Sequence, residues 1–272
     1  MTVLPDFTTA LFVPADRPER FAKAAAAGAD AVIVDLEDAV APPNKASARE
    51  SLLSQPLNVL GVPVILRING ADTEWHERDV AVAAELDLAA VMLPKADLGG
   101  ALDALSKGPA RHVPILALIE TALGLDQVRA IASHASVRRL AFGSIDFCAD
   151  LGCAHERDAL LFARSTIVLA SRLAGLPAPI DGVTTAIDDK ALIESDARHG
   201  LALGFGGKLC IHPRQVAAAR SGYLPDATEI AWAEKVLSSG DAAVAVDGAM
   251  VDEPVRMRAR RVLVQVHRAT QR

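Results

Sequence analysis

The segment Pro114-Ile-Leu-Ala-Leu-Ile-Glu120-Thr121 is an unbroken apolar run that ends on an acid. A second run, Leu140-Ala-Phe-Gly-Ser-Ile-Asp146-Phe147, ends in the same way. Continuous apolar runs of this length are typical of parallel strands that are covered on both faces. The pattern predicts two buried strands that stop on Glu120 and Asp146. If these strands are neighbours, their tips lie roughly 5–10 Å apart, because adjacent strands are spaced about 4.8 Å.

Short apolar runs alternate with helical patterns along most of the chain, and glycines stand where several of the helices should end. Eight such units predict an α/β fold, a (β/α)8 TIM barrel. A doubly wound sheet is the alternative, but no G-x-G-x-x-G follows the first strand. The expected strands are 10–14, 31–36, 64–68, 90–93, 115–119, 139–142, 179–182 and 208–211, and the expected helices are 18–27, 46–53, 74–86, 98–106, 123–133, 157–174, 188–199 and 213–220.

The C-terminal tail does not fit this repeat. It contains a further helix at 228–237, a small-residue stretch at 238–248 and an arginine-rich helix at 255–268. A barrel formed by residues 1–222 is already closed without these segments. We therefore expect residues 223–272 to form additional C-terminal helices that cap the barrel, serve as a lid or pack on a neighbouring subunit.

The bulk properties exclude several classes of protein. The chain has 272 residues, 51% of them hydrophobic, and a formal net charge of -6, which argues against a nucleic-acid partner. No basic stretch with an apolar core opens the chain, so we expect no signal peptide. The apolar runs are far shorter than the roughly 20 residues that span a membrane. These features predict a soluble cytoplasmic protein. Cys148, Cys153 and Cys210 lack C-x-x-C spacing, so we expect them to be reduced core residues.

Charged residues follow almost every expected strand. Catalytic groups of TIM barrels lie at the C-terminal ends of the strands, so these residues should meet at one mouth. Two carboxylates there, Glu120 and Asp146, are hard oxygen ligands that suit a Mg²⁺ ion with positions left open for a substrate. The set of strand-end residues is Asp16, Arg17, Asp35, Glu37, Asp38, Arg67, Asn69, Lys95, Glu120, Asp146, Asp181 and His212.

Several of these residues have structural roles as alternatives. Arg67 either neutralises the acidic cluster or clamps a substrate carboxylate with its guanidinium fork. Lys95 is either a salt-bridged rim lysine or a substrate contact. His212 has no second histidine at ligand spacing, which favours packing or a ligand-edge hydrogen bond over metal binding. The remaining alternatives are helix N-terminal charges for Asp35, Glu37 and Asp38, and loop stabilisation for Asp16 and Asp150.

Eight segments carry this pattern in order along nearly the whole chain: Leu11-Phe-Val-Pro14, Asp35-Leu-Glu-Asp-Ala-Val40, Arg67-Ile-Asn69, Met92-Leu-Pro-Lys95, Ile119-Glu120-Thr121, Phe142-Gly-Ser-Ile-Asp146, Lys208-Leu-Cys-Ile-His-Pro213 and Gly248-Ala-Met-Val-Asp252. Together they resemble the HpcH/HpaI aldolase–citrate lyase family, and more closely its branch of citrate lyase β-subunit-like proteins. The chain departs from the family at Thr8-Thr9, where arginine-serine is frequent, and at Ala15, where glycine is frequent.

The resemblance implies a Mg²⁺-dependent carbon–carbon lyase. Its substrates would be 3-hydroxyacyl thioesters such as malyl-CoA, citramalyl-CoA or a citryl thioester, cleaved to an acetyl thioester and a 2-oxo acid. Glu120 and Asp146 would hold the metal at the substrate. Arg67 would contact the substrate and stabilise the enolate oxygen. Asp252, delivered across a subunit boundary, would exchange a proton with the acetyl carbon.

Other roles follow from the resemblance less specifically. Glu37 or Asp38 would be the base for the hydroxyl proton or would support the waters on the metal. Contacts to CoA would come from Arg17, Lys45 and Arg49. The family habit implies a homotrimer or hexamer. Two alternatives keep the same site, a malyl-CoA thioesterase and a 2-oxo acid aldolase. A third is a non-catalytic subunit that works with an acyl-carrier protein.

Overall fold

The computed structural model describes residues 4–240, 244–246 and 249–270. The chain divides into two compact units, Met1–Arg220 and Ser221–Arg272. Each unit is described below by itself.

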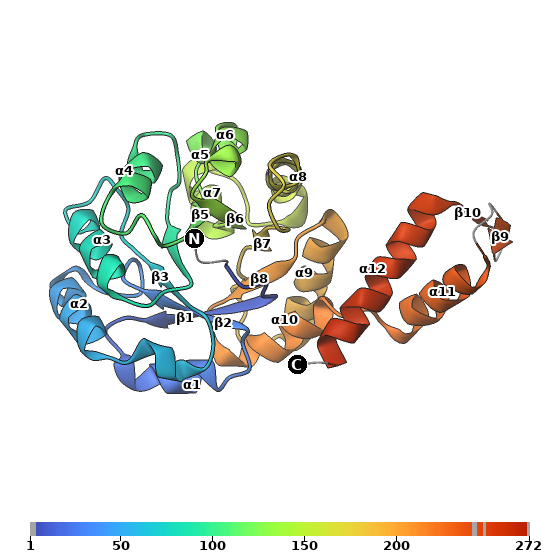
Figure 1. The fold of residues 1–272 in the computed structure, drawn as a ribbon, viewed down its shortest axis with the longest axis horizontal. Helices are drawn as coiled ribbons and strands as arrows, with labels where there is room; N and C mark the ends of the chain where they lie inside the picture. Colours follow the sequence, from blue (N-terminus) through green and yellow to red (C-terminus); the bar gives the residue numbers. More distant parts are fainter. Residues whose placement is uncertain (1–3, 241–243, 247–248, 271–272) are drawn as a thin grey trace. The chain divides into compact units, whose positions relative to one another are not determined.

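The first unit is a closed barrel of parallel strands in sequential order (Figure 1). The last strand closes the barrel by pairing with the first, with Ala10 opposite Leu209. This confirms the predicted TIM barrel. The strands are β1 Thr9–Pro14, β2 Ala31–Asp35, β3 Val64–Arg67, β4 Ala90–Leu93, β5 Ile115–Ile119, β6 Val137–Phe142, β7 Ile180–Asp181 and β8 Gly207–Cys210.

Helices surround the strands, as Figure 1 shows. The expected helices are all present, although the one at 123–133 is divided at Gln127 into two. The α-helices of this unit are α1 Phe21–Ala25, α2 Lys45–Ser54, α3 His76–Glu85, α4 Ala101–Lys107, α5 Ala122–Asp126, α6 Val128–Ser133, α7 Ser144–Leu151, α8 Arg157–Leu173, α9 Lys190–Leu203 and α10 Val216–Gly222, with short 3-10 helices η1 Pro18–Arg20, η2 Pro42–Asn44, η3 Leu57–Leu60 and η4 Pro213–Gln215.

Two apolar layers explain why the strands are continuous apolar runs. Alternate residues point into the barrel, where Ile33, Ile65 and Leu116 pack in one cluster. Their sequence neighbours point outward, and Val32 and Val34 pack in a second cluster with the helices. Since both faces of the strands are covered, apolar side chains fill most strand positions. Arg139 in β6 and Lys208 in β8 are buried exceptions. Glu120, in contrast, follows directly after its strand.

The apolar run that ends on Asp146 is a strand only as far as Phe142, the end of the expected range 139–142. β6 ends at Phe142, and the chain turns at Gly143 into α7, so Asp146 lies in the first turn of a helix. The turn is fixed by the amide of Phe147, which donates to the carbonyl of Gly143 at 3.0 Å. Ile145 is 38% exposed, which a strand buried on both faces would not allow. Asp146 is thus carried by a helix and not by a strand tip.

The second unit consists of α11 Ala227–Ser238, a short antiparallel pair, β9 Val244–Val246 and β10 Ala249–Val251, and α12 Glu253–Thr270. Both helices were expected, whereas the strand pair was not. Within the small-residue stretch 238–248, residues 241–243 and 247–248 lie outside the described residues. The unit has an apolar core of its own, formed by Ala233, Val236, Val251, Ala259 and Val262.

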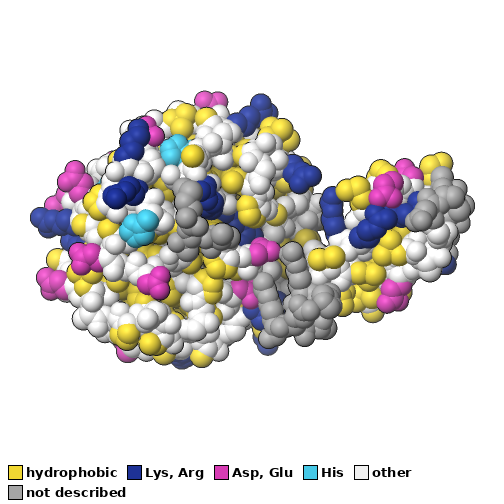
Figure 2. All heavy atoms as spheres, viewed as in Figure 1, with side chains coloured by type: hydrophobic (Ala, Val, Ile, Leu, Met, Phe, Trp, Pro, Cys, Tyr) yellow, Lys and Arg dark blue, Asp and Glu magenta, His cyan; other side chains and the backbone are white. Residues whose placement is uncertain are grey.

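Surface charge is mixed in sign. On the face of the barrel unit shown in Figure 2, Lys and Arg side chains are scattered among Asp and Glu side chains. Within the described part of the chain, no helix has the length and apolarity needed to cross a membrane.

Candidate active site

A cavity of about 380 Å³ lies at the mouth of the barrel. Its walls come from the C-terminal ends of several strands and from the start of α7. Apolar side chains form much of the lining, and the charged groups among them are few. The charged lining residues are Asp35, Asp38, Arg67, Glu120 and Asp146.

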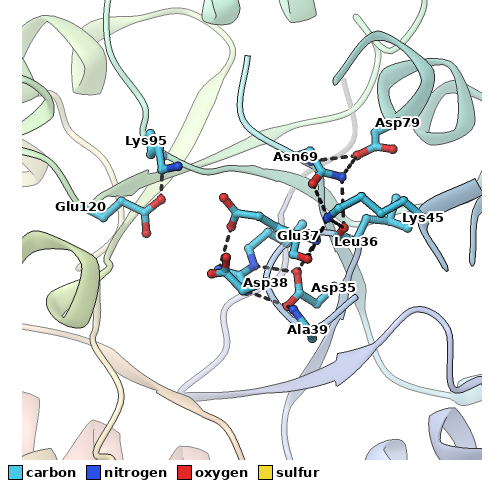
Figure 3. Close-up of polar contacts among 11 residues, drawn as sticks. Asp35, Leu36, Glu37, Asp38, Ala39, Lys45, Asn69, Asp79, Lys95 and Glu120 are labelled. Atoms are coloured by element: carbon cyan, nitrogen blue, oxygen red, sulfur yellow. Dashed lines mark hydrogen bonds and ion pairs between the residues drawn. The ribbon is translucent and has the colours of Figure 1, made fainter. Parts of the chain in front are cut away.

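Glu120 follows directly after β5 and is only 1% exposed. Its Oε1 oxygen accepts a hydrogen bond from the backbone amide of Lys95 at 2.8 Å (Figure 3). Its Oε2 oxygen has no hydrogen-bond partner among the described residues. Burial, followed by the nearby charges of Glu37 and Asp146, raises the pKa of Glu120 well above its ordinary value. Glu120 is therefore a buried carboxylate with one oxygen unsatisfied.

Asp146 is placed beside Glu120 by neighbouring strands. β5 and β6 pair in parallel, with Ile119 opposite Phe142, as the two apolar runs predicted. Ser144 stabilises the start of α7 because its hydroxyl is 2.9 Å from Nε2 of His155. The charge of Asp146 contributes to the raised pKa of Glu120, so the two carboxylates interact electrostatically.

The two acids fit a hard divalent cation. Oε2 of Glu120 is buried without a partner, and a second carboxylate lies on the same wall of the cavity. No cluster of three His, Cys, Asp or Glu side chains with metal-binding geometry occurs among the described residues. Two protein ligands suffice for Mg²⁺, which usually keeps several waters and binds through one or two carboxylates plus substrate oxygens.

Arg67 ends β3 and is paired with three carboxylates. Nε and Nη2 donate to the two oxygens of Asp35 at 2.7 and 2.6 Å, which is a bidentate pair. Nη1 lies 2.9 Å from Oε2 of Glu37 and 3.3 Å from Oδ2 of Asp38. The guanidinium carbon also lies 4.8 Å from the centre of the Phe12 ring. Arg67 neutralises the acidic cluster and at the same time lines the cavity.

Asp35 organises the loop after β2. Its carboxylate accepts from the amide of Glu37 at 2.8 Å and from the amide of Ala39 at 3.1 Å (Figure 3). This fixes Glu37 beside Arg67, where burial raises the pKa of Glu37 to about 7 although Arg67 opposes the shift. The Asp38 side chain is 66% exposed, so it is bound less firmly in the cluster.

The three expected CoA contacts lie in different settings, and none of them lines the cavity. The Lys45 ammonium is buried and donates to the carbonyls of Leu36 and Glu37 and to Oδ1 of Asn69. Arg49 is buried and paired with Asp79 at 2.9 Å. The Arg17 side chain is 56% exposed, and its contact to Asp16 is long, at 4.0 Å.

Sequence reasoning missed the network that supports the loops after β2 and β3. Asn69 donates through its amide nitrogen to the carbonyl of Leu36 and to Asp79, and it accepts from Lys45 (Figure 3). Asp79 is fully buried in α3. An acid on the apolar face of a predicted helix is the signal that would have revealed it, because buried carboxylates need partners.

Asp252 belongs to the second unit. It directly precedes α12, and its Oδ1 accepts from the amide of Val255 at 3.3 Å. Gly248, which begins the segment that carries Asp252, lies outside the described residues.

The chain belongs to the HpcH/HpaI aldolase/citrate lyase family, whose model matches residues 8–213. It is 38% identical over 270 residues to a citrate lyase subunit beta-like protein of Mycobacterium tuberculosis, covering 96% of each chain. It is 31% identical over 271 residues to a (3S)-malyl-CoA thioesterase of Cereibacter sphaeroides, covering 95% of this chain and 94% of that protein.

The fold is also similar to a solved structure. The crystal structure of CitE from Mycobacterium tuberculosis, in complex with magnesium, acetoacetate and coenzyme A, matches with a TM-score of 0.88 and 36% identity. The match covers 97% of this chain and 100% of that one. The expected family and its citrate lyase β-like branch are thereby confirmed.

Proposed function

We propose that the protein is a Mg²⁺-dependent carbon–carbon lyase that cleaves a 3-hydroxyacyl-CoA thioester to acetyl-CoA and a 2-oxo acid. The unsatisfied, buried Oε2 of Glu120 beside Asp146 carries this proposal. The similar CitE structure, which holds magnesium, acetoacetate and coenzyme A, supports the choice of metal and substrate class.

The charge balance of the mouth also supports a divalent cation. Five carboxylates lie in or beside the cavity, and Arg67 is the cation that is paired with three of them. Glu120 and Asp146 would hold the Mg²⁺ ion, which would act as a Lewis acid on the oxygens of the 2-oxo acid half of the substrate. The five carboxylates are Asp35, Glu37, Asp38, Glu120 and Asp146.

Glu37 is the proposed base for the 3-hydroxyl proton. A general base works best when its pKa lies near the operating pH, and the pKa of Glu37 is raised to about 7. Asp38 follows Glu37 in the same loop, but its side chain is mostly exposed. Arg67 holds Glu37 in place and supplies positive charge on the cavity wall where the enolate oxygen develops.

In the proposed cleavage, Glu37 takes the hydroxyl proton and the carbon–carbon bond next to the former hydroxyl carbon breaks. Its electron pair moves into the thioester as an enolate, while the hydroxyl carbon becomes the carbonyl of the 2-oxo acid. Asp252 of a neighbouring copy then donates a proton to the enolate carbon, which gives the acetyl thioester. This proton transfer requires a homo-oligomer, and we propose a trimer or hexamer. We also propose that the exposed Arg17 contacts CoA.

The test is to incubate the protein and Mg²⁺ with citramalyl-CoA, malyl-CoA and citryl-CoA while acetyl-CoA, free thiol and oxo acid are followed. Acetyl-CoA and oxo acid in equal amounts are expected from one of the thioesters. Free CoA with intact hydroxy acid would instead show a thioesterase, which the 31% identity to a (3S)-malyl-CoA thioesterase makes the second candidate. Turnover of a free 2-oxo acid would show an aldolase. Turnover of a thioester only when an acyl-carrier protein presents it would show a complex-bound subunit.

A further inference from the structure

Lys95 has a backbone conformation that lysine rarely adopts. Its φ is 46°, and it is the one residue other than glycine with a positive φ in the described part of the chain. Residues with a Cβ are disfavoured in this region, which glycine enters freely. Position 95 is therefore one where glycine would relieve strain, and the chain has a lysine there.

The surrounding turn holds this conformation. The amide of Lys95 donates to Oε1 of Glu120 at 2.8 Å, and the amide of Ala96 donates to the carbonyl of Leu118 at 3.1 Å. The carbonyl of Ala96 lies where a side chain on Gly124 would be, 2.7 Å from a Cβ built there. These contacts involve only the backbone of residues 95 and 96. They explain the conformation of the turn, but they do not explain why residue 95 is a lysine.

The lysine side chain has no structural partner. It is exposed, and its ammonium makes no hydrogen bond or ion pair with any residue that the structure describes. It nevertheless lies near enough to Glu37 for its charge to favour the Glu37 carboxylate and lower the pKa of that group. The Arg67 guanidinium, in contrast, is occupied by Asp35, Glu37 and Asp38.

We propose that Lys95 is a substrate-binding residue whose ammonium contacts an anionic group of the substrate at the barrel mouth. This rests on the proposed function. The backbone amide of Lys95 binds the Glu120 carboxylate, which lines the cavity, and the flexible stem of Lys95 carries an exposed ammonium from this position. Two groups have the required chemistry, the carboxylate of the 2-oxo acid half and a phosphate of CoA.

The test compares Lys95→Gly, Lys95→Gln and Lys95→Arg with the wild type by calorimetric titration. The probes are oxaloacetate with saturating Mg²⁺, CoA alone and Mg²⁺ alone. Lys107 is exposed at the end of α4 and paired with Asp103, so Lys107→Ala is the control for the loss of one lysine. We expect the Gly and Gln variants to raise the Kd of one organic probe about tenfold, and Lys95→Arg to restore most of that loss.

The probe that loses affinity identifies the group, oxaloacetate for the carboxylate and CoA for the phosphate. The Kd for Mg²⁺ should not change, since each variant keeps the amide that binds Glu120, and Lys95→Gly should melt no lower than the wild type. Wild-type Kd values for both organic probes in the Gly and Gln variants would overturn the inference. An equal loss of Mg²⁺ affinity would also overturn it. If the wild type binds the probes but cleaves no thioester, the proposed function fails and the role of Lys95 is still decided by binding.

Discussion

Gly143 has no space for a side chain because Glu120 occupies it. A Cβ at position 143 would overlap Oε2 of Glu120 and would be 2.5 Å from the Glu120 Cβ. The φ of Gly143 is -87°, so its backbone conformation alone does not require glycine. The glycine is needed because the end of β6 passes directly over the proposed metal ligand.

Replacement of Gly143 should therefore damage the metal site specifically. We expect Gly143→Ala to displace the Glu120 carboxylate and to weaken Mg²⁺ binding at least about tenfold. Gly99→Ala is a matched control, because the atoms that its Cβ would meet belong to the flexible Asp97 side chain. Titration calorimetry with Mg²⁺ checks both variants. Equal Mg²⁺ affinities in the wild type and Gly143→Ala would contradict the placement of the metal on Glu120.

Replacement of the two proposed metal ligands should have different effects on the thermal midpoint of the metal-free protein. Glu120→Gln should abolish Mg²⁺ binding and raise the thermal midpoint without metal at pH 8, because it removes a buried, partly unsatisfied charge. Asp146→Asn should also abolish binding, but with little gain in the midpoint, since Asp146 is only partly buried. Thermal melts with and without Mg²⁺ distinguish the two. Retained Mg²⁺ stabilisation in either variant would exclude that residue as a ligand.

Arg67 should be important for stability as well as for turnover. Arg67→Ala leaves Asp35 buried and unpaired, which costs about 3–5 kcal/mol in the free energy of unfolding. The exposed pair Arg214–Asp188 is the control, and Arg214→Ala should cost about 1 kcal/mol or less. Denaturant unfolding measures both. The double variant Arg67→Ala/Asp35→Asn should recover part of the loss, and no recovery would show that Asp35 is not the main partner.

Stability should depend on pH through Glu37. Its pKa is raised from 4.5 to about 7 in the folded protein, mainly by burial, so the folded state binds this proton more tightly than the unfolded chain does. This contribution is fully present below about pH 4.5 and is lost as the pH rises through about 7, by up to about 3 kcal/mol. Unfolding of Glu37→Gln, compared with the wild type between pH 5 and pH 8, isolates it. Parallel curves for the two proteins would refute the shift.

A site shared between copies can be tested by mixing inactive variants. If Asp252 acts in a neighbouring copy, coexpressed Glu120→Gln and Asp252→Asn chains form some complete sites, and part of the activity returns. Mixtures of Asp252→Asn with Asp252→Ala contain no complete site and should stay inactive. Lack of rescue in the first mixture, with mixed oligomers verified by mass spectrometry, would place Asp252 and Glu120 of one chain in the same site or remove Asp252 from it.

The fold was predictable because the strands are covered on both faces, which makes most of them continuous apolar runs such as Ile115–Ile119. Glu120 was located correctly as the first residue after its strand. The expected range 139–142 has the correct end, but the prediction that this strand stops on Asp146 was wrong, since Phe142 and Ile145 are both apolar and nothing in their types shows that one is buried and the other exposed. Local turns of this kind depend on contacts such as that between Ser144 and His155, which lie eleven positions apart.

The partners of the cations were only partly predictable. The acidic cluster was one of two alternatives for Arg67, and the structure shows that pairing. The residue types alone do not show that Lys45 binds carbonyls, nor that the Lys95 ammonium has no partner among the described residues. The strained φ of Lys95 has no signature in the residue types, because the pair Pro94-Lys95 is compatible with ordinary turns.

The separate apolar core of the second unit has an evolutionary consequence. Val236, Val251 and Ala259 pack among themselves, so the packing that holds the segment carrying Asp252 does not depend on the core inside the barrel. Mutations that reshape the cavity wall to admit a different acyl group therefore leave the local setting of Asp252 intact. Under selection for a new substrate, the barrel mouth can diversify while the tail is inherited unchanged.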